Sequence, residues 1–170
     1  MMRTSAPAPE KIWDQPVVKL IDLPMEQLVQ VLQLQLQTGG VALLTVTGTS
    51  MYPTFCHRRD KVILSLGAPR KYDTVLYKRD SGEYILHRIV KKEDCFLCCG
   101  DNQWQTEAVR EDQILAVAVG FERKGERFSV DHWNYTLWVR LWTWLLPVRK
   151  PILAARYGLG KIRRAMLRRN

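Results

Sequence analysis

The chain has 170 residues, which suits one domain with modest extensions, and its 46% hydrophobic and 25% charged residues are an ordinary globular balance. The net charge is +9, and it is uneven: nine basic residues and no acidic one follow Asp131, so the chain up to that residue is neutral. No segment has the roughly 20 consecutive apolar residues of a spanning helix. Residues 1–16 lack the apolar core of a signal peptide. We therefore expect neither a spanning helix nor an N-terminal signal peptide.

The N-terminal part divides into two segments. Residues 1–23 begin with a stretch rich in alanine and proline, which indicates a flexible lead-in. In residues 24–40, apolar side chains recur at helical spacing, and five glutamines cover the remaining positions before Gly39-Gly40. This pattern predicts an amphipathic helix over 24–38 that ends at the glycine pair.

From Val41 the pattern changes to short segments rich in β-branched and apolar residues, separated by turn sequences. The segments are Val41–Thr47, Lys61–Leu66, Asp73–Lys78, Glu83–Lys91, Cys95–Cys99 and Ile114–Arg123. Because no helical pattern lies between them, we expect a mainly β domain over 41–131, as a small curved antiparallel barrel or sandwich.

The last segment, residues 132–170, combines aromatic and basic residues. Tryptophans and aliphatic residues fill 133–146, Pro147 and Pro151 interrupt the pattern, and a basic amphipathic stretch follows. Two interpretations stay open. Residues 133–169 contact a membrane surface, where tryptophan and arginine suit the interface, or they form a helix packed on the β domain with a solvated basic end. Nucleic-acid binding, which charge alone permits, ranks below both.

Ser50 lies in the sequence Gly48-Thr-Ser-Met-Tyr-Pro-Thr54, directly after an apolar strand. A serine at a strand end, between Gly48 and Pro53, can be fixed on a turn with its hydroxyl toward a cleft. Such a turn also offers backbone N–H groups to an oxyanion, while the hydroxyl needs a base to become nucleophilic. The alternative is a plain turn, since these residue types are common in turns.

The pattern Gly-x-Ser-Met-x-Pro resembles the nucleophile motif of the signal peptidase and LexA-type repressor superfamily. Four further segments resemble that superfamily in the same order along the chain. They are Arg59-Asp60-Lys-Val-Ile-Leu, Tyr72-Asp73-Thr-Val-Leu-Tyr, Glu83-Tyr-Ile-Leu-His87-Arg88-Ile-Val and Gly100-Asp101-Asn102. The resemblance covers about residues 41–121. It implies a serine peptidase with Ser50 as nucleophile and His87 as general base, acting on peptides with small residues before the cut.

The residue at the base position distinguishes the subtypes of this superfamily. Typical bacterial signal peptidases and LexA-type proteins have a lysine there, whereas His87 resembles the endoplasmic-reticulum and archaeal type with its Ser-His pair. A histidine, with an unperturbed pKa of about 6.5, acts as a base near neutral pH without extensive desolvation. Strand alternation places Ile85, His87 and Ile89 on one face, so the alternative is a core histidine with a structural hydrogen bond.

A carboxylate that orients the imidazole improves a Ser-His pair. The resemblance implies this role for Asp101, for which an Asx turn is the alternative. The endoplasmic-reticulum type has a second aspartate six residues after the first, and this chain has Glu107 at that spacing. Glu107 is therefore a possible secondary carboxylate.

The oxyanion site departs from the bacterial pattern. Bacterial signal peptidases commonly have a serine two residues before the nucleophile, where this chain has Gly48, as in the LexA-type motif. The oxyanion would then depend on the Ser50 backbone N–H, with the hydroxyl of Thr49 or Thr47. Candidate residues for oxyanion or substrate binding are Thr49, Met51 and Pro53.

The cysteines suggest a metal site only weakly. Cys95 and Cys98 form a C-x-x-C pair, but on a strand these positions face opposite sides, and no second spaced pair exists. Buried free thiols are the better interpretation. We expect no metal and no cofactor.

The sequence thus predicts a serine endopeptidase that cleaves signal or leader peptides and is peripherally membrane-associated or cytoplasmic. Its partners would be a peptide or protein substrate, a membrane surface, and a membrane subunit that supplies an anchor. Two alternatives stay open. One is a non-catalytic regulator or membrane-surface adaptor that retains the peptidase fold. The other is a self-cleaving protein of LexA type, against which the absence of Ala-Gly dipeptides counts.

Overall fold

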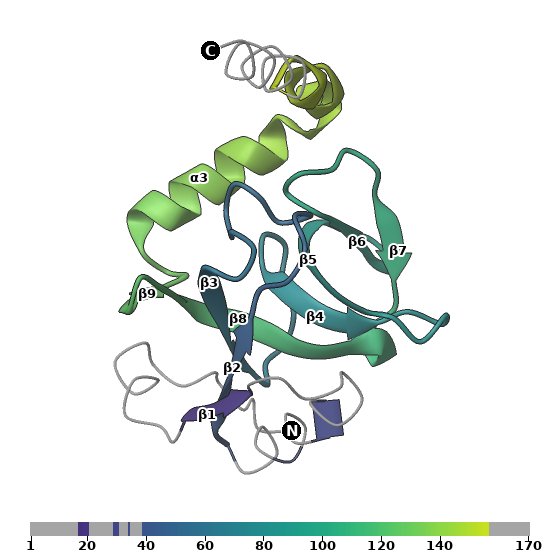
Figure 1. Ribbon diagram of the computed structural model, residues 1–170. Coiled ribbons are helices and arrows are strands. Elements are labelled where there is room, and N and C mark those ends of the chain that lie inside the picture. The colour runs from purple at the N-terminus through teal and green to yellow at the C-terminus, as the bar shows by residue number, and fades with distance from the viewer. Residues whose placement is uncertain (1–16, 21–28, 31–33, 35–38, 157–170) are drawn as a thin grey trace, which may run out of the picture.

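The fold is mainly antiparallel β, with helices after the last strand (Figure 1). The computed structural model describes residues 17–20, 29–30, 34 and 39–156. The strands are β1 (Val17–Leu20), β2 (Val41–Thr45), β3 (Asp60–Ser65), β4 (Thr74–Lys78), β5 (Tyr84–Lys92), β6 (Phe96–Cys99), β7 (Glu107–Val109), β8 (Ile114–Arg123) and β9 (Glu126–Ser129). The helices are η1 (Glu111–Gln113), α3 (Trp133–Trp144) and η2 (Leu146–Val148), followed by a helical stretch over 149–156.

The strands form one sheet in the order β1-β2-β3-β8-β4-β5-β6-β7, with β9 paired to β8. Only the β1–β2 pair is parallel among the described strands. The two ends of this order do not pair with each other, so the sheet is open. The expectation of a mainly antiparallel β domain is confirmed, and the finer expectation of a small curved barrel or sandwich stays a prediction.

Alternating side chains along the strands build apolar clusters on both faces of the sheet. The larger cluster gathers around Met51, Phe55 and Phe121, with Leu76 of β4 and Leu86 of β5 on the same face. The second cluster lies on the opposite face and contains Val75, Tyr77, Ile85, Ile89, Phe96, Cys98, Val109 and Val117. Neighbouring residues of β4 and β5 therefore point to different cores.

Helix α3 covers one side of the sheet, beside the loop that joins β2 to β3 (Figure 1). Val139, Trp142 and Thr143 form its buried face. The Trp-rich block therefore packs against the β domain, as one of the two interpretations of the C-terminal segment expects. None of the described helices is long and apolar enough to cross a membrane.

All six expected strands form, with ends that differ from the expectation by at most two residues. The short strands β1, β7 and β9 were not expected, because three or four residues such as Glu-Ala-Val carry too little pattern of their own. They exist through pairing with longer neighbours. β1 also corrects the expected lead-in over 1–23. Most of the helix expected over 24–38, and the basic end after residue 156, lie outside the described residues.

Candidate functional site

The turn that carries Ser50 begins two residues after β2 and is held by backbone contacts. Gly48 has a φ of +82°, a left-handed conformation that glycine adopts without strain, and its N–H donates to Nδ1 of His57 over 2.9 Å. The Asn102 N–H donates to the Ser50 carbonyl oxygen over 2.6 Å. A Cβ at Gly100 would lie 2.7 Å from the same oxygen, so only glycine allows this approach. The Ser50 turn is thereby fixed against the turn after β6.

Ser50 lines a cavity of about 110 Å³ between β2 and the β4–β5 hairpin. The side chain of Met51 is buried and forms part of the wall, whereas neither Thr49 nor Pro53 lines the cavity. Five of the eight remaining lining residues are aliphatic and three carry hydroxyl groups: they are Leu44, Thr45, Val46, Thr47, Leu76, Tyr84, Ile85 and Leu86. The cavity suits a small apolar side chain next to the Ser50 hydroxyl.

His87 lies in the middle of β5, opposite Val75 of β4, and only 4% of its surface is exposed. Its Nδ1 is 3.1 Å from Oε1 of Glu107 and 3.2 Å from the hydroxyl oxygen of Tyr77. Burial lowers the pKa of His87, and the negative charge of Glu107 opposes this shift. A neutral imidazole whose Nδ1–H donates to a carboxylate presents Nε2 as a proton acceptor.

Glu107 is fixed by side chains from β4 and from the turn that follows it. It is the first residue of β7, opposite Cys98 of β6. Arg79 donates to both of its oxygens, over 2.7 and 2.9 Å, and the Tyr77 hydroxyl also donates to Oε1. Burial alone would raise the pKa of Glu107, but these hydrogen bonds lower it. Glu107 is thus a charged carboxylate with a fixed orientation toward His87.

Asp101 has a different partner from the one that the sequence predicts. Its carboxylate accepts two hydrogen bonds from Arg88, from Nε over 2.9 Å and from Nη2 over 2.7 Å, and both side chains are fully buried. Arg88 follows His87 directly, so strand alternation places the two residues on opposite faces of β5. Asp101 lies on the face of Arg88. Among the described residues no hydrogen bond joins Asp101 to His87, and the carboxylate beside His87 Nδ1 is that of Glu107.

Ser50 and His87 are close in the fold without touching through a hydrogen bond. The Ser50 cavity is walled by Ile85 and Leu86, the two residues before His87, yet His87 does not line it. Among the described residues, no hydrogen bond joins the Ser50 hydroxyl to His87. The structure therefore brings together His87 and Glu107, and it places Ser50 in a cavity that two other residues of β5 also line.

The C-terminal helices hold both turns of this region. The Trp138 indole N–H donates to the hydroxyl of Thr54 over 2.9 Å, and the Trp142 indole N–H donates to the carbonyl oxygen of Asp101 over 2.8 Å. Arg149, fully buried, donates to the carbonyl oxygens of Gly100, Gln103 and Trp142. These residues were not expected near the site, because no local pattern links a tail residue to a turn about 40 positions earlier.

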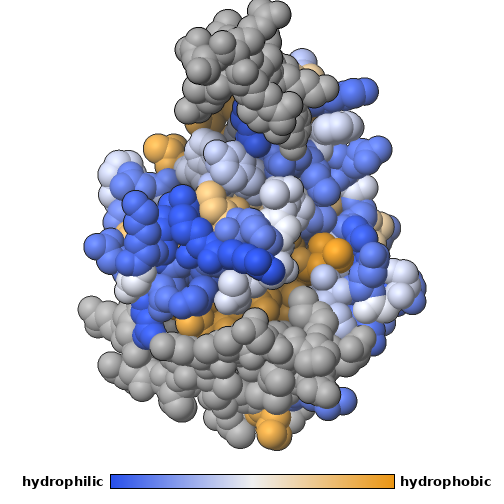
Figure 2. Space-filling model, in the orientation of Figure 1, coloured by the Kyte–Doolittle hydropathy of each residue, from blue (hydrophilic) through white to orange (hydrophobic). Residues whose placement is uncertain are grey.

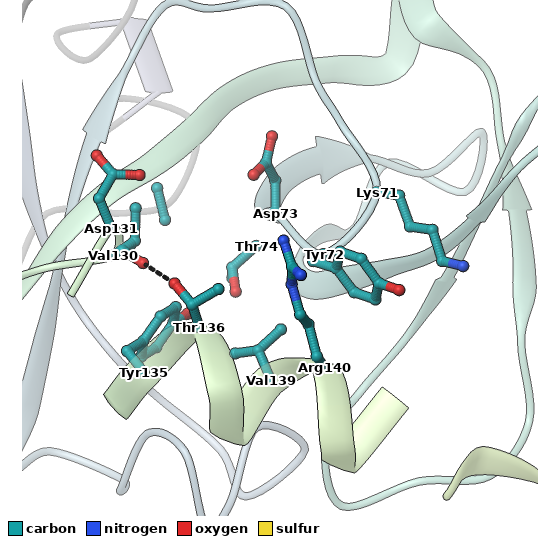
Figure 3. Close-up of a pocket in the computed structure, with 11 residues that line it drawn as sticks. Lys71, Tyr72, Asp73, Thr74, Val130, Asp131, Tyr135, Thr136, Val139 and Arg140 are labelled. Carbon is teal, nitrogen blue, oxygen red and sulfur yellow. Dashed lines mark hydrogen bonds between the residues drawn. The ribbon is translucent and has the colours of Figure 1, made fainter. Parts of the chain in front are cut away.

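A second cavity, of about 160 Å³, lies between α3 and the sheet (Figure 3). It shares no lining residue with the Ser50 cavity. Its wall mixes charges of both signs, from Lys71, Asp73, Asp131 and Arg140, and burial raises the pKa of Asp73. The buried hydroxyl of Thr74 also lines it and has no hydrogen-bond partner within the described part of the chain. These side chains give no consistent chemistry for one reaction.

The two buried cysteines are poor nucleophiles. All four are free, and Cys98 and Cys99 are buried. Burial raises the pKa of Cys98 to about 12 and that of Cys99 to about 11, so both stay protonated at neutral pH and are weak nucleophiles. In residues 39–156 and the shorter described stretches, no group of three or more histidine, cysteine or acidic side chains is placed to hold a metal ion.

No protein-family model matches the chain, and no curated protein is similar to it in sequence. The function must therefore be inferred from the residues themselves. The arrangement offers an imidazole that can accept a proton, a carboxylate that orients it, and a serine beside a small apolar cavity. These parts suit nucleophilic acyl transfer more than any other reaction.

Proposed function

We propose that the protein is a serine endopeptidase in which Ser50 is the nucleophile, His87 the general base and Glu107 the carboxylate that orients the base. The observation that carries this proposal is the contact of Glu107 with Nδ1 of a buried histidine on the strand that walls the Ser50 cavity. The resemblance of the motifs around Ser50, His87 and Asp101 to the signal peptidase superfamily supports it. Asp101 keeps a structural role beside the site.

In the proposed reaction, Ser50 Oγ attacks the scissile carbonyl carbon while His87 Nε2 takes the hydroxyl proton and later gives it to the leaving amine. The imidazolium that forms is stabilised by Glu107 through Nδ1–H. The Ser50 N–H, which makes no hydrogen bond within the described part of the chain, is available to the oxyanion. The Ser50–His87 hydrogen bond has to form when substrate binds, since catalytic hydrogen bonds are often loose in free enzymes.

The cavity limits the substrate. A void of about 150 Å³ accommodates a benzene molecule, so the cavity of about 110 Å³ beside Ser50 fits an alanine or valine side chain better than an aromatic one. Its leucine, isoleucine and methionine wall disfavours charged side chains. We therefore propose a signal or leader peptide with a small apolar residue near the cleavage site as the substrate.

Covalent labelling tests the nucleophile without knowledge of the substrate. A fluorophosphonate probe reacts with activated serines: the serine oxygen bonds to phosphorus, fluoride leaves, and the base takes the proton. We expect mass spectrometry to locate the adduct on Ser50. The adduct should be absent in Ser50→Ala and strongly reduced in His87→Gln, with Ser65→Ala as a matched control that labels normally. A folded protein that takes up no probe, or takes it up at another serine, would contradict the proposal.

The pH dependence of the reaction tests the base. Because only neutral His87 accepts a proton, kcat/KM should rise with pH through the His87 titration, and burial places the midpoint below the ordinary value of 6.5. The Glu107 charge raises the pKa of His87, so Glu107→Gln should move the midpoint still lower. Hydrolysis of a leader peptide, or the labelling rate, measured across the acid range gives both midpoints. A rate that does not change with pH would exclude a histidine base.

A non-catalytic adaptor with the same fold is the second candidate function. The observation that favours it is the missing hydrogen bond between Ser50 and His87. In that case Ser50 stays unlabelled at every pH, and Ser50→Ala keeps the full biological activity of the protein.

A further inference from the structure

Helix α3 presents an apolar face to solvent, opposite its buried face, and two further exposed apolar residues follow in η2 and in the helical stretch after it. The exposed side chains repeat at spacings of three and four residues, and between 38% and 76% of the surface of each is exposed. They are Trp133, Leu137, Leu141, Trp144, Val148 and Ile152, called here the outer face. At 3.6 residues per turn, the four on α3 fall within an arc of about 80°. In Figure 2 the surface over α3 is of mixed hydropathy, with a small apolar patch beside the helix, and larger apolar areas lie lower in the same view.

The charged residues of the segment that carries the outer face, residues 132–170, have one sign, although Arg140 lines the cavity that also holds Asp73 and Asp131. No acidic residue follows Asp131 in the sequence, whereas nine basic residues do. Among the described ones, Arg140 and Lys150 are exposed, and Arg149 is buried inside the protein. Arg140 precedes Leu141 of the outer face and lies over the Tyr72 ring, so its charge flanks that face on the side of the sheet. The outer face is therefore an apolar strip with cations beside it and no nearby acidic residue of its own segment.

We propose that the outer face docks this protein on the surface of an anionic lipid bilayer. A helix with tryptophan and leucine on one face and cations at its edge suits the boundary between headgroups and acyl chains. Tryptophans near both ends of α3, at positions 133 and 144, suit the headgroup level. Basic residues near the surface add attraction to anionic lipid. A protein partner would need complementary acidic groups, and a second copy of this chain would bring the same positive charge toward itself.

The residues that follow α3 contact the loops around the proposed site. The Arg156 guanidinium lies over the ring of Tyr52, two residues after Ser50, with 4.5 Å between them. Lys150 lies over the ring of Trp104, in the loop after the Gly100–Gln103 turn. The residues after α3 therefore lie beside the Ser50 turn and the loop after β6, whereas the outer face of α3 points away from the turn at Asp101.

Vesicle co-sedimentation of the full chain tests the docking surface. We expect binding to phosphatidylcholine vesicles that contain phosphatidylglycerol, and much weaker binding to pure phosphatidylcholine. The variant L137E/L141E should bind anionic vesicles with an affinity lower by about tenfold or more per substitution. Each substitution removes the favourable free energy of moving a leucine side chain from water into the membrane interface. The matched control is Leu66→Glu, which changes an equally exposed leucine at the end of β3. Binding by this control should be unchanged.

Each outcome decides the proposal. Loss of binding in L137E/L141E with retention in Leu66→Glu supports it. Equal binding of L137E/L141E and the unchanged chain overturns it, as does equal binding to charged and uncharged vesicles. A dimer that L137E/L141E abolishes, with no vesicle binding, assigns the outer face to a second copy instead. Labelling of Ser50 in L137E/L141E is a separate measurement, so failure of the docking proposal and failure of the peptidase proposal are distinguishable.

Discussion

Glu107→Gln is expected to lower kcat of peptide hydrolysis by about 10²–10⁴-fold while the protein stays folded. The amide keeps the size of the side chain but removes the negative charge beside His87 Nδ1. The imidazolium then loses its stabilising partner, and the amide N–H₂ can face Nδ1 and favour the tautomer whose Nε2 carries the proton. Steady-state kinetics on a leader peptide, or the rate of fluorophosphonate labelling, gives the size of the effect.

The matched control for this experiment is Glu83→Gln. Glu83 also accepts a hydrogen bond from Arg79, over 3.0 Å, but it is exposed and makes no contact with His87. Loss of an exposed ion pair has little effect, so its kcat should be unchanged. If both variants reduced kcat equally, the effect would come from Arg79 and not from a carboxylate at the histidine. If neither did, the orienting role of Glu107 would be wrong.

The sequence predicts well what depends on local pattern. Alternation of apolar residues predicts the six longer strands, and it also places Ile85, His87 and Ile89 together, as the pairing of His87 with Val75 confirms. The Gly48–Pro53 pattern predicts a turn at Ser50, and the structure has one there. These features are set by residues within a few positions of each other.

Long-range contacts were less predictable. The choice between Asp101 and Glu107 depends on which face of β5 each carboxylate meets, and that depends on the β6–β7 pairing, where β7 is only three residues long. The spacing of six residues from Asp101 to Glu107 was the one sequence signal for the second carboxylate. Nothing in the sequence of the tail predicts that Trp142 and Arg149 hold the turn at Asp101. Such contacts arise from packing of distant segments.

Arg88 explains why the turn after β6 needs an aspartate. The Arg88 guanidinium is fully buried on β5, and besides Asp101 it donates to the Tyr72 carbonyl oxygen and lies over the Tyr135 ring. Only Asp101 neutralises its charge within the described residues. The pair also joins β5 to the turn that contacts the Ser50 carbonyl oxygen. Asp101 therefore has a structural partner in Arg88.

Asp101→Asn is accordingly expected to lower the free energy of unfolding by about 3–5 kcal/mol, since it leaves a buried guanidinium without its counter-charge. That is a large fraction of the roughly 5–15 kcal/mol that stabilises a typical domain. Urea unfolding followed by tryptophan fluorescence measures this loss of free energy. The control is Asp80→Asn, because Asp80 pairs with Arg110 on the exposed surface. Loss of this exposed pair should leave the urea midpoint unchanged.

The kinetics of Asp101→Asn separate the two carboxylates. At urea concentrations below its unfolding midpoint, Asp101→Asn should keep a kcat close to that of the unchanged chain, when kcat is calculated per folded molecule. The kcat of Glu107→Gln should be much lower, because the His87–Glu107 contact is on the other face of β5. A variant with unchanged stability and a kcat as low as that of Glu107→Gln would show the reverse: Asp101 would then act on His87, and Arg88 would tolerate burial without it. The two variants should therefore give opposite results. Asp101→Asn should lower the free energy of unfolding and largely keep kcat, whereas Glu107→Gln should lower kcat and keep the free energy of unfolding.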